Sequence, residues 1–484
     1  MIFNSVQYAL FLPMAVIVYI LLPQKVRWLF LLVASYFFYM CWDARYAVLL
    51  LTSTAVTFFA ANLMKKSDSR RQRVFYLISG LAVNLGILFI FKYFNFFIET
   101  AAGIAGLFGA DYKPVELKLL LPIGISFYTF QSLGYMLDVY MDKTKAMSHF
   151  GKYALFVSFF PQLAAGPIGR IDSLRPQFDL CSRPTLENIR SGLLLIGQGL
   201  FKKLVIADRL GVLVNTVYDS PADHYGMHFA AATVFFAVQI YCDFSGYSDI
   251  AIGSARLLGI ELMENFKRPY LATTVSEFWK RWHISLTSWF RDYIYIPLGG
   301  NRRRHLFNIM VVFFVSGLWH GASLTFIVWG LLNGLYQVLG IILRPYSGKL
   351  KERLGVKDSS AIYRAFKMLW CFALISFSWI FFRANSIGDI KLILSRLFTF
   401  NASFLTGFNT ASLGMDRTDL VVSALLIIIL FIYELAMEKE KIGKSFRNSP
   451  LVLRWAFYLI VIAIIIVFGV YGDANGAQFI YFQF

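Results

Sequence analysis

Long apolar blocks separated by short polar stretches run through the whole chain. Most blocks approach the ~17 to 25 residues that a membrane-spanning helix needs, and none shows the alternation of a barrel strand. The blocks cover residues 6–22, 28–41, 46–63, 74–98, 119–140, 153–165, 191–214, 229–252, 308–343, 366–382, 420–436 and 453–471. Backbone groups in lipid must be hydrogen-bonded within their own segment, so the blocks predict helices. We expect an all-α polytopic membrane protein of about 11–13 helices, some re-entrant or short and interfacial, forming one domain over residues 1–484.

Composition supports a membrane protein. Of the 484 residues, 58% are hydrophobic and 15% charged, and the mean hydropathy is +0.61, whereas soluble domains are roughly a quarter charged. The first apolar block lacks the basic start and cleavage site of a secretory signal, so we expect it to remain as a helix. The four cysteines show neither a CxxC pair nor metal-ligand spacing, and we predict no metal site.

The basic residues predict the orientation, because short loops rich in Lys and Arg stay cytoplasmic. The stretches 65–73, 267–304 and 344–367 are basic, and counting crossings between them places both termini outside. The net charge of +18 then reflects topology and contact with anionic lipid head groups. Because the cations are spread over several inside loops, we predict no nucleic-acid partner.

His320 lies within the apolar block 308–343, which is long enough for a hairpin of two short crossings. It follows Arg304 by 16 residues, so at ~1.5 Å per residue it lies roughly 24 Å from that charge, deep in the membrane. An ionisable residue at this depth indicates a functional site, and imidazole can exchange a proton near neutral pH. The alternative is a histidine hydrogen-bonded between helices for packing. Gly317 and Gly321, spaced as small-xxx-small, favour close backbone approach or a narrow passage.

A second unusual stretch, about residues 256–307, mixes Trp, Tyr and Arg with apolar residues and is too charged to span. It is typical of an amphipathic segment at the cytoplasmic interface. It contains His283 beside the cations Lys280, Arg281 and Arg291, a group that suits a phosphorylated substrate. The alternative is an ordinary surface helix anchored by tryptophans.

Other polar positions give weaker signals. The run Asp243, Ser245, Tyr247, Ser248 and Asp249 closes the 229–252 block and either lines a site or marks a helix end reaching the interface. Asp138 either lines the acceptor side or makes a structural hydrogen bond. The remaining histidines are expected to lie solvated in loops; they are His149, His224, His228 and His305.

Several segments together resemble the membrane-bound O-acyltransferase superfamily, and in particular its bacterial branch of alginate O-acetylases. Three segments are the most specific. They are Trp-Lys-Arg-Trp-His-Ile-Ser-Leu, Arg-Asp-Tyr-Ile-Tyr-Ile-Pro-Leu-Gly-Gly-Asn-Arg, and a third that begins Ser-Gly-Leu-Trp-His-Gly-Ala-Ser and ends Trp-Gly. They occupy residues 279–286, 291–302 and 316–330, with further matches at 121–131, 160–167, 239–253 and 479–482. The ordered set extends over the whole chain.

The resemblance implies a multi-pass enzyme of the bacterial cell (inner) membrane. Such an enzyme takes an acyl group from a cytoplasmic thioester, usually acetyl-CoA as co-substrate and with no bound cofactor, and passes it to a hydroxyl on or across the membrane. It implies His320 as the catalytic residue and His283 as the second family histidine. An extracytoplasmic transferase is the implied partner. We predict as substrate- and donor-binding residues Trp319, Trp282, Lys280, Arg281, Arg291, Asp243 and Tyr247.

For the chemistry we favour direct transfer with His320 as general base over an acyl-enzyme, since no Ser-His-Asp arrangement is visible. Trp319 or His283 is a candidate donor to the oxyanion. One alternative is transfer of D-alanyl or another acyl group to a cell-wall polymer through a partner. The alternative from a different class is a transporter of a polysaccharide precursor, with His320 as a proton relay.

Overall fold

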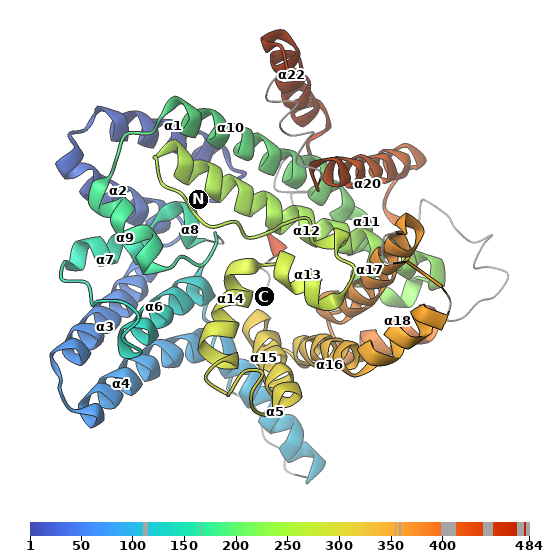
Figure 1. The fold of residues 1–484 in the computed structure, drawn as a ribbon, viewed down its shortest axis with the longest axis horizontal. Coiled ribbons are helices and arrows are strands. Elements are labelled where there is room, and N and C mark those ends of the chain that lie inside the picture. Colours follow the sequence, from blue (N-terminus) through green and yellow to red (C-terminus); the bar gives the residue numbers. More distant parts are fainter. Residues whose placement is uncertain are drawn as a thin grey trace. The chain divides into compact units, whose positions relative to one another are not determined.

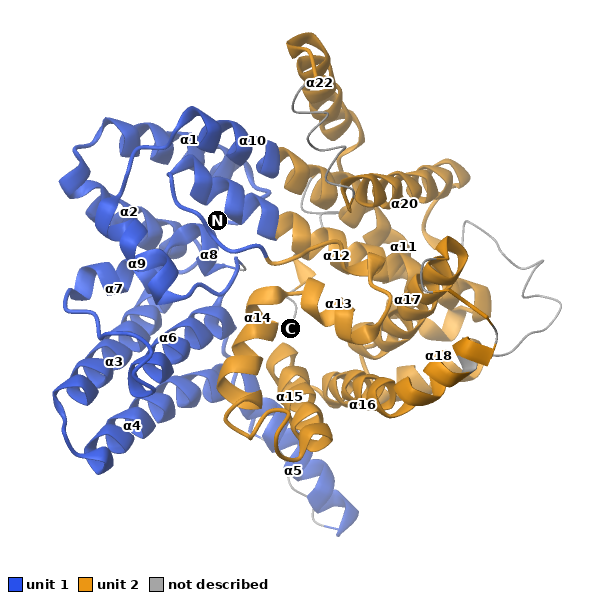
Figure 2. Cartoon of the chain, viewed as in Figure 1, with its two compact units in different colours: residues 1–196, 248–264 blue, residues 197–247, 265–484 orange. Residues whose placement is uncertain are grey.

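All regular elements in the described residues are helices, which confirms the all-α prediction (Figure 1). The computed structural model describes residues 1–109, 115–164, 166–353, 355–357, 360–397, 413–438, 449–471 and 479–480. The chain forms two compact units, residues 1–196 with 248–264 and residues 197–247 with 265–484 (Figure 2). Helices α10 and α12 each run from one unit into the other.

Unit 1 holds the first helices of the chain. They are α1 (Val6–Leu21), α2 (Gln24–Met40), η1 (Ala44–Tyr46), α3 (Ala47–Lys66), α4 (Arg70–Leu88), η2 (Phe89–Tyr93), α5 (Phe94–Leu107), α6 (Ile125–Tyr140), α7 (Phe150–Ser158), α8 (Phe160–Leu163), α9 (Ile171–Leu180) and the start of α10 (Leu186–Leu200).

Unit 2 contains the motif segments. Its elements are η3 (Phe201–Ala207), α11 (Asp208–Asp219), η4 (Pro221–Asp223), most of α12 (Gly226–Leu257), η5 (Pro269–Leu271), α13 (Val275–Arg281), α14 (Ile284–Phe290), η6 (Arg291–Tyr295), α15 (His305–His320), α16 (Leu324–Arg353), α17 (Ala361–Arg383), α18 (Ile387–Leu397), α20 (Arg417–Glu438) and α22 (Leu451–Phe468).

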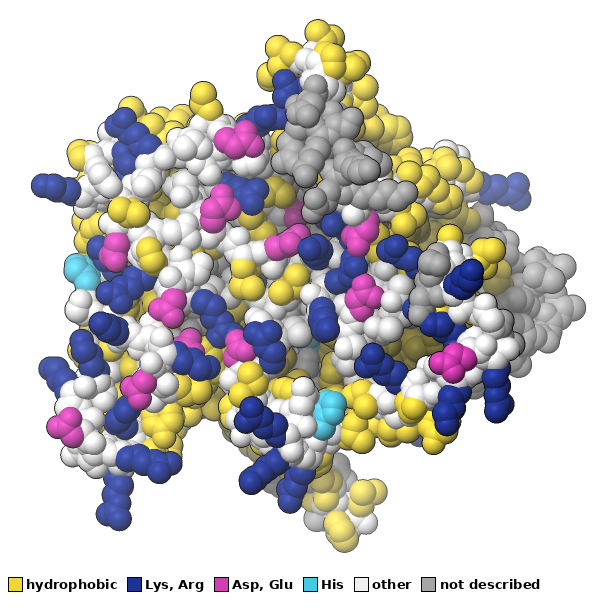
Figure 3. All heavy atoms as spheres, viewed as in Figure 1, with side chains coloured by type: hydrophobic (Ala, Val, Ile, Leu, Met, Phe, Trp, Pro, Cys, Tyr) yellow, Lys and Arg dark blue, Asp and Glu magenta, His cyan; other side chains and the backbone are white. Residues whose placement is uncertain are grey.

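Seven helices within the described residues are long and apolar enough to cross a membrane. They are 44–66, 70–107, 226–257, 324–353, 361–383, 417–438 and 451–468, and two shorter apolar helices are Val6–Leu21 and His305–His320. The predicted blocks 119–140, 153–165 and 191–214 fold instead as α6, as α7 with α8, and as α10–η3–α11. Helix α22 has none of its spanning window buried, and Figure 3 shows mainly hydrophobic side chains over α20 and α22. Apolar side chains exposed along a whole helix indicate contact with lipid.

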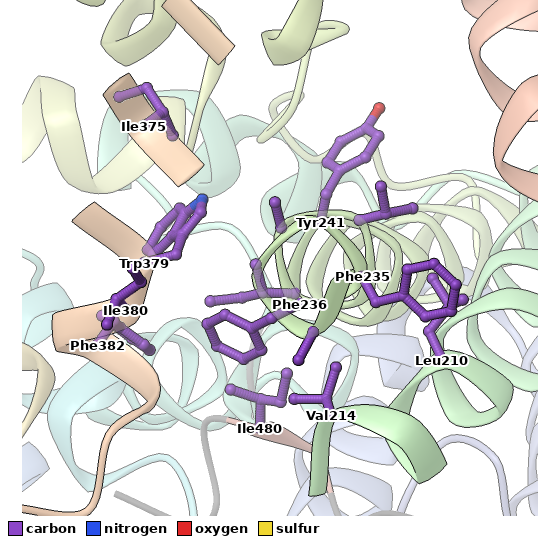
Figure 4. Close-up of a cluster of buried hydrophobic side chains, with 14 of the residues drawn as sticks. Leu210, Val214, Phe235, Phe236, Tyr241, Ile375, Trp379, Ile380, Phe382 and Ile480 are labelled. Carbon is purple, nitrogen blue, oxygen red and sulfur yellow. The ribbon is translucent and has the colours of Figure 1, made fainter. Parts of the chain in front are cut away.

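The core of unit 2 lies between α11, α12 and α17 (Figure 4). Phe236 of α12 and Trp379 of α17 meet edge to face, with ring centroids 6.4 Å apart. Trp379 in turn stacks on Trp329 of α16 at 5.7 Å. Lipid tails are as apolar as these side chains, so close packing rather than escape from water holds such helices together. This aromatic core fixes the wall against which the hairpin α15–α16 packs.

Two of the four histidines expected to be solvated are buried. His224 is 3% exposed and His228 5%, and their Nδ1 atoms lie 3.3 Å apart. The expectation was wrong because His228 is part of α12, which begins at Gly226, and because His224 packs on α11, with its Nε2 3.1 Å from the carbonyl oxygen of Thr216. Arg396 of α18 donates a hydrogen bond to the carbonyl oxygen of His224 at 2.8 Å and so connects α18 to the loop before α12.

Candidate active site

Helix α13, which precedes His283, begins with paired hydrogen bonds. The hydroxyl of Thr274 accepts from the backbone N–H of Glu277 at 3.1 Å, and the Glu277 carboxylate accepts from the N–H and hydroxyl of Thr273 at 2.9 Å each. This is a variant of the capping box. Burial acts to raise the pKa of Glu277, but these bonds and the Arg281 guanidinium outweigh it and lower the pKa. The start of α13, and so the approach of the chain to His283, is fixed.

His283 lies at the turn between α13 and α14. These two short helices belong to the segment that was predicted to lie at the interface. Its φ is +44°, in the left-handed region, and its side chain is 1% exposed. A non-glycine residue there is strained by about 1–3 kcal/mol and persists only where its surroundings hold it. The turn directs the imidazole into the unit instead of along the surface.

The amide oxygen of Asn265 holds the imidazole of His283. This oxygen lies 3.2 Å from His283 Nδ1 and accepts from the N–H of Ser285 at 3.2 Å and its hydroxyl at 2.9 Å. Because a backbone N–H can only donate, the atom facing it is the amide oxygen and not the nitrogen. An oxygen that only accepts requires a proton on His283 Nδ1, and the lone pair of the neutral ring then lies on Nε2.

Burial keeps His283 neutral, since it lowers the pKa of this residue to about 3. A neutral ring that donates from Nδ1 can accept a proton or a hydrogen bond at Nε2, but it cannot donate there. This tautomer argues against the expectation that His283 donates to an oxyanion. It suits an acceptor that orients a substrate hydroxyl.

The block 308–343 forms the predicted helical hairpin, α15 and α16, and glycines allow its two helices to touch. A Cβ on Gly317 would lie 2.4 Å from the carbonyl oxygen of Phe326, and one on Gly330 would lie 2.3 Å from the carbonyl oxygen of Phe313. A Cβ on Gly321 would enter the Phe326 ring at 2.1 Å. Gly317 and Gly321 therefore serve the close approach that their spacing predicted.

His320 is the last residue of α15 and is enclosed by aromatic rings. Its ring lies edge to face with Trp319 and Trp329, both at 4.9 Å between centroids, and with Phe382 at 5.4 Å. The side chain is 4% exposed. Rings in this geometry attract the imidazole and fix its plane.

The two motif histidines line one cavity of about 160 Å³. Its lining comes from α13, α14, η6 and the hairpin, and comprises Trp279, His283, Leu286, Thr287, Phe290, Arg291, Tyr295, Ile309, Val312, Phe313, Ser316, His320 and Gln337. Trp319 contacts both histidines, at 4.9 Å from the His320 ring and 5.9 Å from that of His283. Residues 37 positions apart in the sequence thus share one small, mostly apolar chamber.

The predicted cations lie in different places. Arg291 lines the cavity, is largely exposed and donates to Asp292 at 2.8 Å. Arg281 is ion-paired with Glu277 at 2.8 Å and Glu438 at 3.1 Å. Lys280 is exposed. Among the described residues, Arg291 is thus the guanidinium at the cavity lining, and Lys280 and Arg281 lie outside that lining.

Trp282, Asp243 and Tyr247 also lie outside the cavity lining. Trp282 is 1% exposed and belongs to the aromatic core, 5.2 Å from the Trp379 ring. Asp243 and Tyr247 are buried inside α12, which continues to Leu257, so the interpretation of this run as a helix end reaching the interface was wrong. The local hydropathy falls at this run because its residues are polar. The helix nevertheless continues through it, with these polar groups buried.

Asp138 lies in α6 of unit 1, where it forms an ion pair. Its carboxylate is 3.9 Å from Arg170 Nη1, and the residue is 9% exposed.

Several polar site residues were not predicted from the sequence, among them Asn265, Thr287, Tyr295, Ser316 and Gln337. Ser316 had a signal, because it precedes His320 by four residues and so shares its helix face. Asn265 had none, since a polar residue in a loop 18 positions before His283 is common.

Comparison with known proteins shows which family the chain resembles. Residues 141–349 match the model of the MBOAT, membrane-bound O-acyltransferase family. The chain is 37% identical to the "probable alginate O-acetylase AlgI" of Pseudomonas putida, over 88% of this chain and 86% of that one. It is 34% identical to the peptidoglycan O-acetyltransferase of Helicobacter pylori, over 81% and 78%. It is 29% identical to the teichoic acid D-alanyltransferase of Streptococcus thermophilus, over 46% and 57%.

The family match contains both cavity histidines, and the likeness to the first relative extends over most of the two chains. The seven apolar helices agree with a protein that crosses the membrane several times. The chain therefore belongs to the membrane-bound O-acyltransferase family and is a multi-pass membrane acyltransferase.

Proposed function

We propose that this enzyme transfers an acetyl group from a cytoplasmic thioester, acetyl-CoA, for the O-acetylation of an extracytoplasmic polysaccharide, with His320 as general base. The observation that carries the proposal is that His320 and His283 line the same cavity. Acyl transfer needs a base beside the attacking hydroxyl, and a positioned histidine typically contributes ~10² to 10⁴-fold.

The size of the cavity and the relatives favour acetyl over other acyl groups. A cavity of about 160 Å³ is close to the ~150 Å³ cavity that holds one benzene molecule, so it accepts a two-carbon acyl group and not a long chain. The relatives named for O-acetylation are 34–37% identical over most of the chain, whereas the D-alanyltransferase is 29% identical over 46% of it.

In the proposed reaction the acceptor oxygen attacks the thioester carbonyl carbon while its proton passes to His320. The carbon–sulfur bond then breaks, and the protonated His320 returns the proton to the departing sulfur, so CoA leaves as the thiol. His283, with its Nε2 lone pair, accepts a hydrogen bond that orients a reacting group. The exposed guanidinium of Arg291 suits a phosphate of the donor.

The location and partner follow from the same proposal. We infer from the basic loops that Arg291 faces the cytoplasm at a bacterial inner membrane, and we propose that the acetyl group crosses without CoA crossing. A separate extracytoplasmic transferase then completes transfer to the glycan. The D-alanyl alternative keeps the same histidines and changes only the donor.

The experiment is transfer of labelled acetyl from acetyl-CoA by the protein in liposomes. We expect His320→Ala to lower the rate by about 10² to 10⁴-fold. The matched control is His149→Ala, because His149 is an exposed histidine of unit 1. Wild-type transfer by His320→Ala at equal protein amount would overturn the assignment of the base. Transfer of D-alanyl but not acetyl by the wild-type protein would overturn the donor.

A further inference from the structure

A buried charge cluster lies in unit 2 outside the cavity lining. Lys203 Nζ is 2.8 Å from Asp208 Oδ1 and 2.7 Å from Asp243 Oδ1, and all three side chains are at most 2% exposed. Buried ions persist only when they are paired and their remaining lone pairs are hydrogen-bonded. The second oxygen of Asp243 accepts from the backbone N–H of Ile480 at 2.8 Å. The cluster therefore binds a residue 237 positions further along the chain.

The same helical turn also holds the end of α22. Lys203 belongs to η3, a π-helical turn, and the carbonyl of Leu204 in it accepts from the N–H of Val470 at 2.9 Å. π-Helical turns within α-helices are frequent at functional sites. Two backbone groups near the end of the chain, at Val470 and Ile480, are thus fixed to the segment that carries the charge cluster.

The segment Phe479–Ile480 is part of the packing behind His283. The Phe479 ring stacks on Tyr247 at 4.3 Å and lies 5.7 Å from Phe244, whose ring meets His283 edge to face at 4.8 Å. Ile480 is 4% exposed and lies in the core beside the α11 and α12 side chains (Figure 4). One ring, Phe244, separates the C-terminal segment from the imidazole.

We propose that Phe479–Ile480 is a positioning element for His283, seated by the carboxylate of Asp243, and that the Lys203–Asp208–Asp243 cluster exists to form this seat. The inference rests on the proposed role of the cavity histidines. Without the seat, Phe244 loses the ring behind it and the His283 imidazole loses its support on that side. A displacement of about 1 Å at a catalytic group can lower a rate by about 10²-fold.

The test removes the backbone donor of the seat. Ile480→Pro deletes the N–H that Asp243 accepts, and Ile480→Leu keeps both the N–H and the apolar side chain. With full-length protein in liposomes we expect Ile480→Pro to lower kcat for acetyl transfer by about 10 to 10²-fold with KM for acetyl-CoA nearly unchanged, and Ile480→Leu to resemble wild type. A wild-type kcat in Ile480→Pro would overturn the proposal, as would an equal loss in both variants.

Two further measurements keep a folding defect apart from lost positioning. Phe479→Ala should lower kcat as Ile480→Pro does, because it empties the space behind Phe244. Phe479→Leu should lower kcat less, because leucine still fills part of that space. In an Asp243→Leu background, Ile480→Pro should add no further loss, since the acceptor is already absent; multiplied losses would contradict a shared bond.

Hydrogen exchange at the Ile480 amide separates this proposal from the proposed function. The amide should be protected in wild type and exchange fast in Asp243→Leu. If His283→Gln keeps full activity, the role of the histidine fails while the protected amide still supports the seat. If the amide exchanges fast in wild type, the seat fails whatever His283 does.

Discussion

The two histidines of the cavity are held by different kinds of contact. His283, between α13 and α14, is anchored by the amide oxygen of Asn265, which also binds Ser285. His320, at the end of α15, is enclosed by the rings of Trp319, Trp329 and Phe382. A hydrogen bond to an acceptor decides which nitrogen carries the proton, whereas aromatic edges and faces fix only the plane of the ring.

This difference assigns different chemistry to the two residues. A base that gains and returns a proton in each cycle, as proposed for His320, must change its protonation state, and the rings around His320 fix its position. His283 has its tautomer chosen and its pKa lowered by burial, which suits a permanent acceptor. The glycine hairpin places one group, and the Asn265 network orients the other.

The largest effect on this comparison should come from the glycine that places His320. A Cβ at Gly317 meets the Phe326 carbonyl oxygen at 2.4 Å, and backbone cannot give way as a flexible side chain does. Gly317→Ala should separate α15 from α16, displace His320 and lower kcat by about 10²-fold. The measurement is acetyl transfer at equal amounts of folded protein, judged by size-exclusion chromatography.

Gly340→Ala is the matched control in the same hairpin. Nothing lies within 4 Å of a Cβ there, so the substitution changes only helix propensity, which favours Ala by about 1 kcal/mol. We expect unchanged activity and an equal or higher melting temperature. Normal kcat in Gly317→Ala would show that close approach of the two helices does not position His320.

A smaller effect should follow from changing the charge of the group that orients His283. Asn265→Asp keeps an acceptor for His283 Nδ1 and for Ser285, but its carboxylate raises the pKa of the imidazole, by about 1–3 units for a close opposite charge. Activity that needs neutral His283 is then lost at a higher pH as the solution is acidified. The pH profile of kcat/KM should show its acid limb shifted upward.

Ser285→Ala provides the comparison for Asn265→Asp. It removes the hydroxyl of Ser285 that donates to Asn265 and leaves the His283 hydrogen bond and the charge unchanged. Its pH profile should coincide with that of wild type. An identical acid limb in Asn265→Asp would mean that His283 does not need to be neutral during turnover.

The sequence was sufficient for the parts of this site that depend on local pattern. The helical hairpin and the purpose of Gly317 and Gly321 follow from apolar length and small-residue spacing, and the structure agrees. The depth of His320 in the membrane stays a prediction. The resemblance paired His283 with His320, and both line one cavity.

The parts that failed depend on contacts between distant residues. Asp243 was predicted to bind the substrate or donor, with a helix end at the interface as the alternative, yet its partners Lys203 and Ile480 come from η3 and the end of the chain. Asn265 gave no signal because its role depends on the fold of the loop before α13. Pairing between buried polar groups is not encoded in the spacing along one helix.

The smallest effect concerns stability, and it tests whether His283 is neutral at all. Burial lowers its pKa from 6.5 to about 3 in the folded protein. Below pH 6.5 the unfolded chain therefore binds a proton at His283, whereas His283 in the folded protein stays unprotonated. The contribution of neutral His283 to the free energy of unfolding is therefore fully present above pH 6.5 and declines as the pH falls toward 3.

Each pH unit below 6.5 should thus lower the free energy of unfolding by about 1.4 kcal/mol through His283. His283→Gln removes the titrating group, so between pH 6.5 and 5.5 its melting temperature should fall less than that of wild type. The measurement is the melting temperature in detergent at one fixed scan rate, because membrane proteins often unfold irreversibly. Equal slopes in wild type and His283→Gln would mean that His283 titrates alike in the folded and unfolded protein, and the contrast between a tautomer fixed by Asn265 and a plane fixed by aromatic rings would lose its chemical meaning.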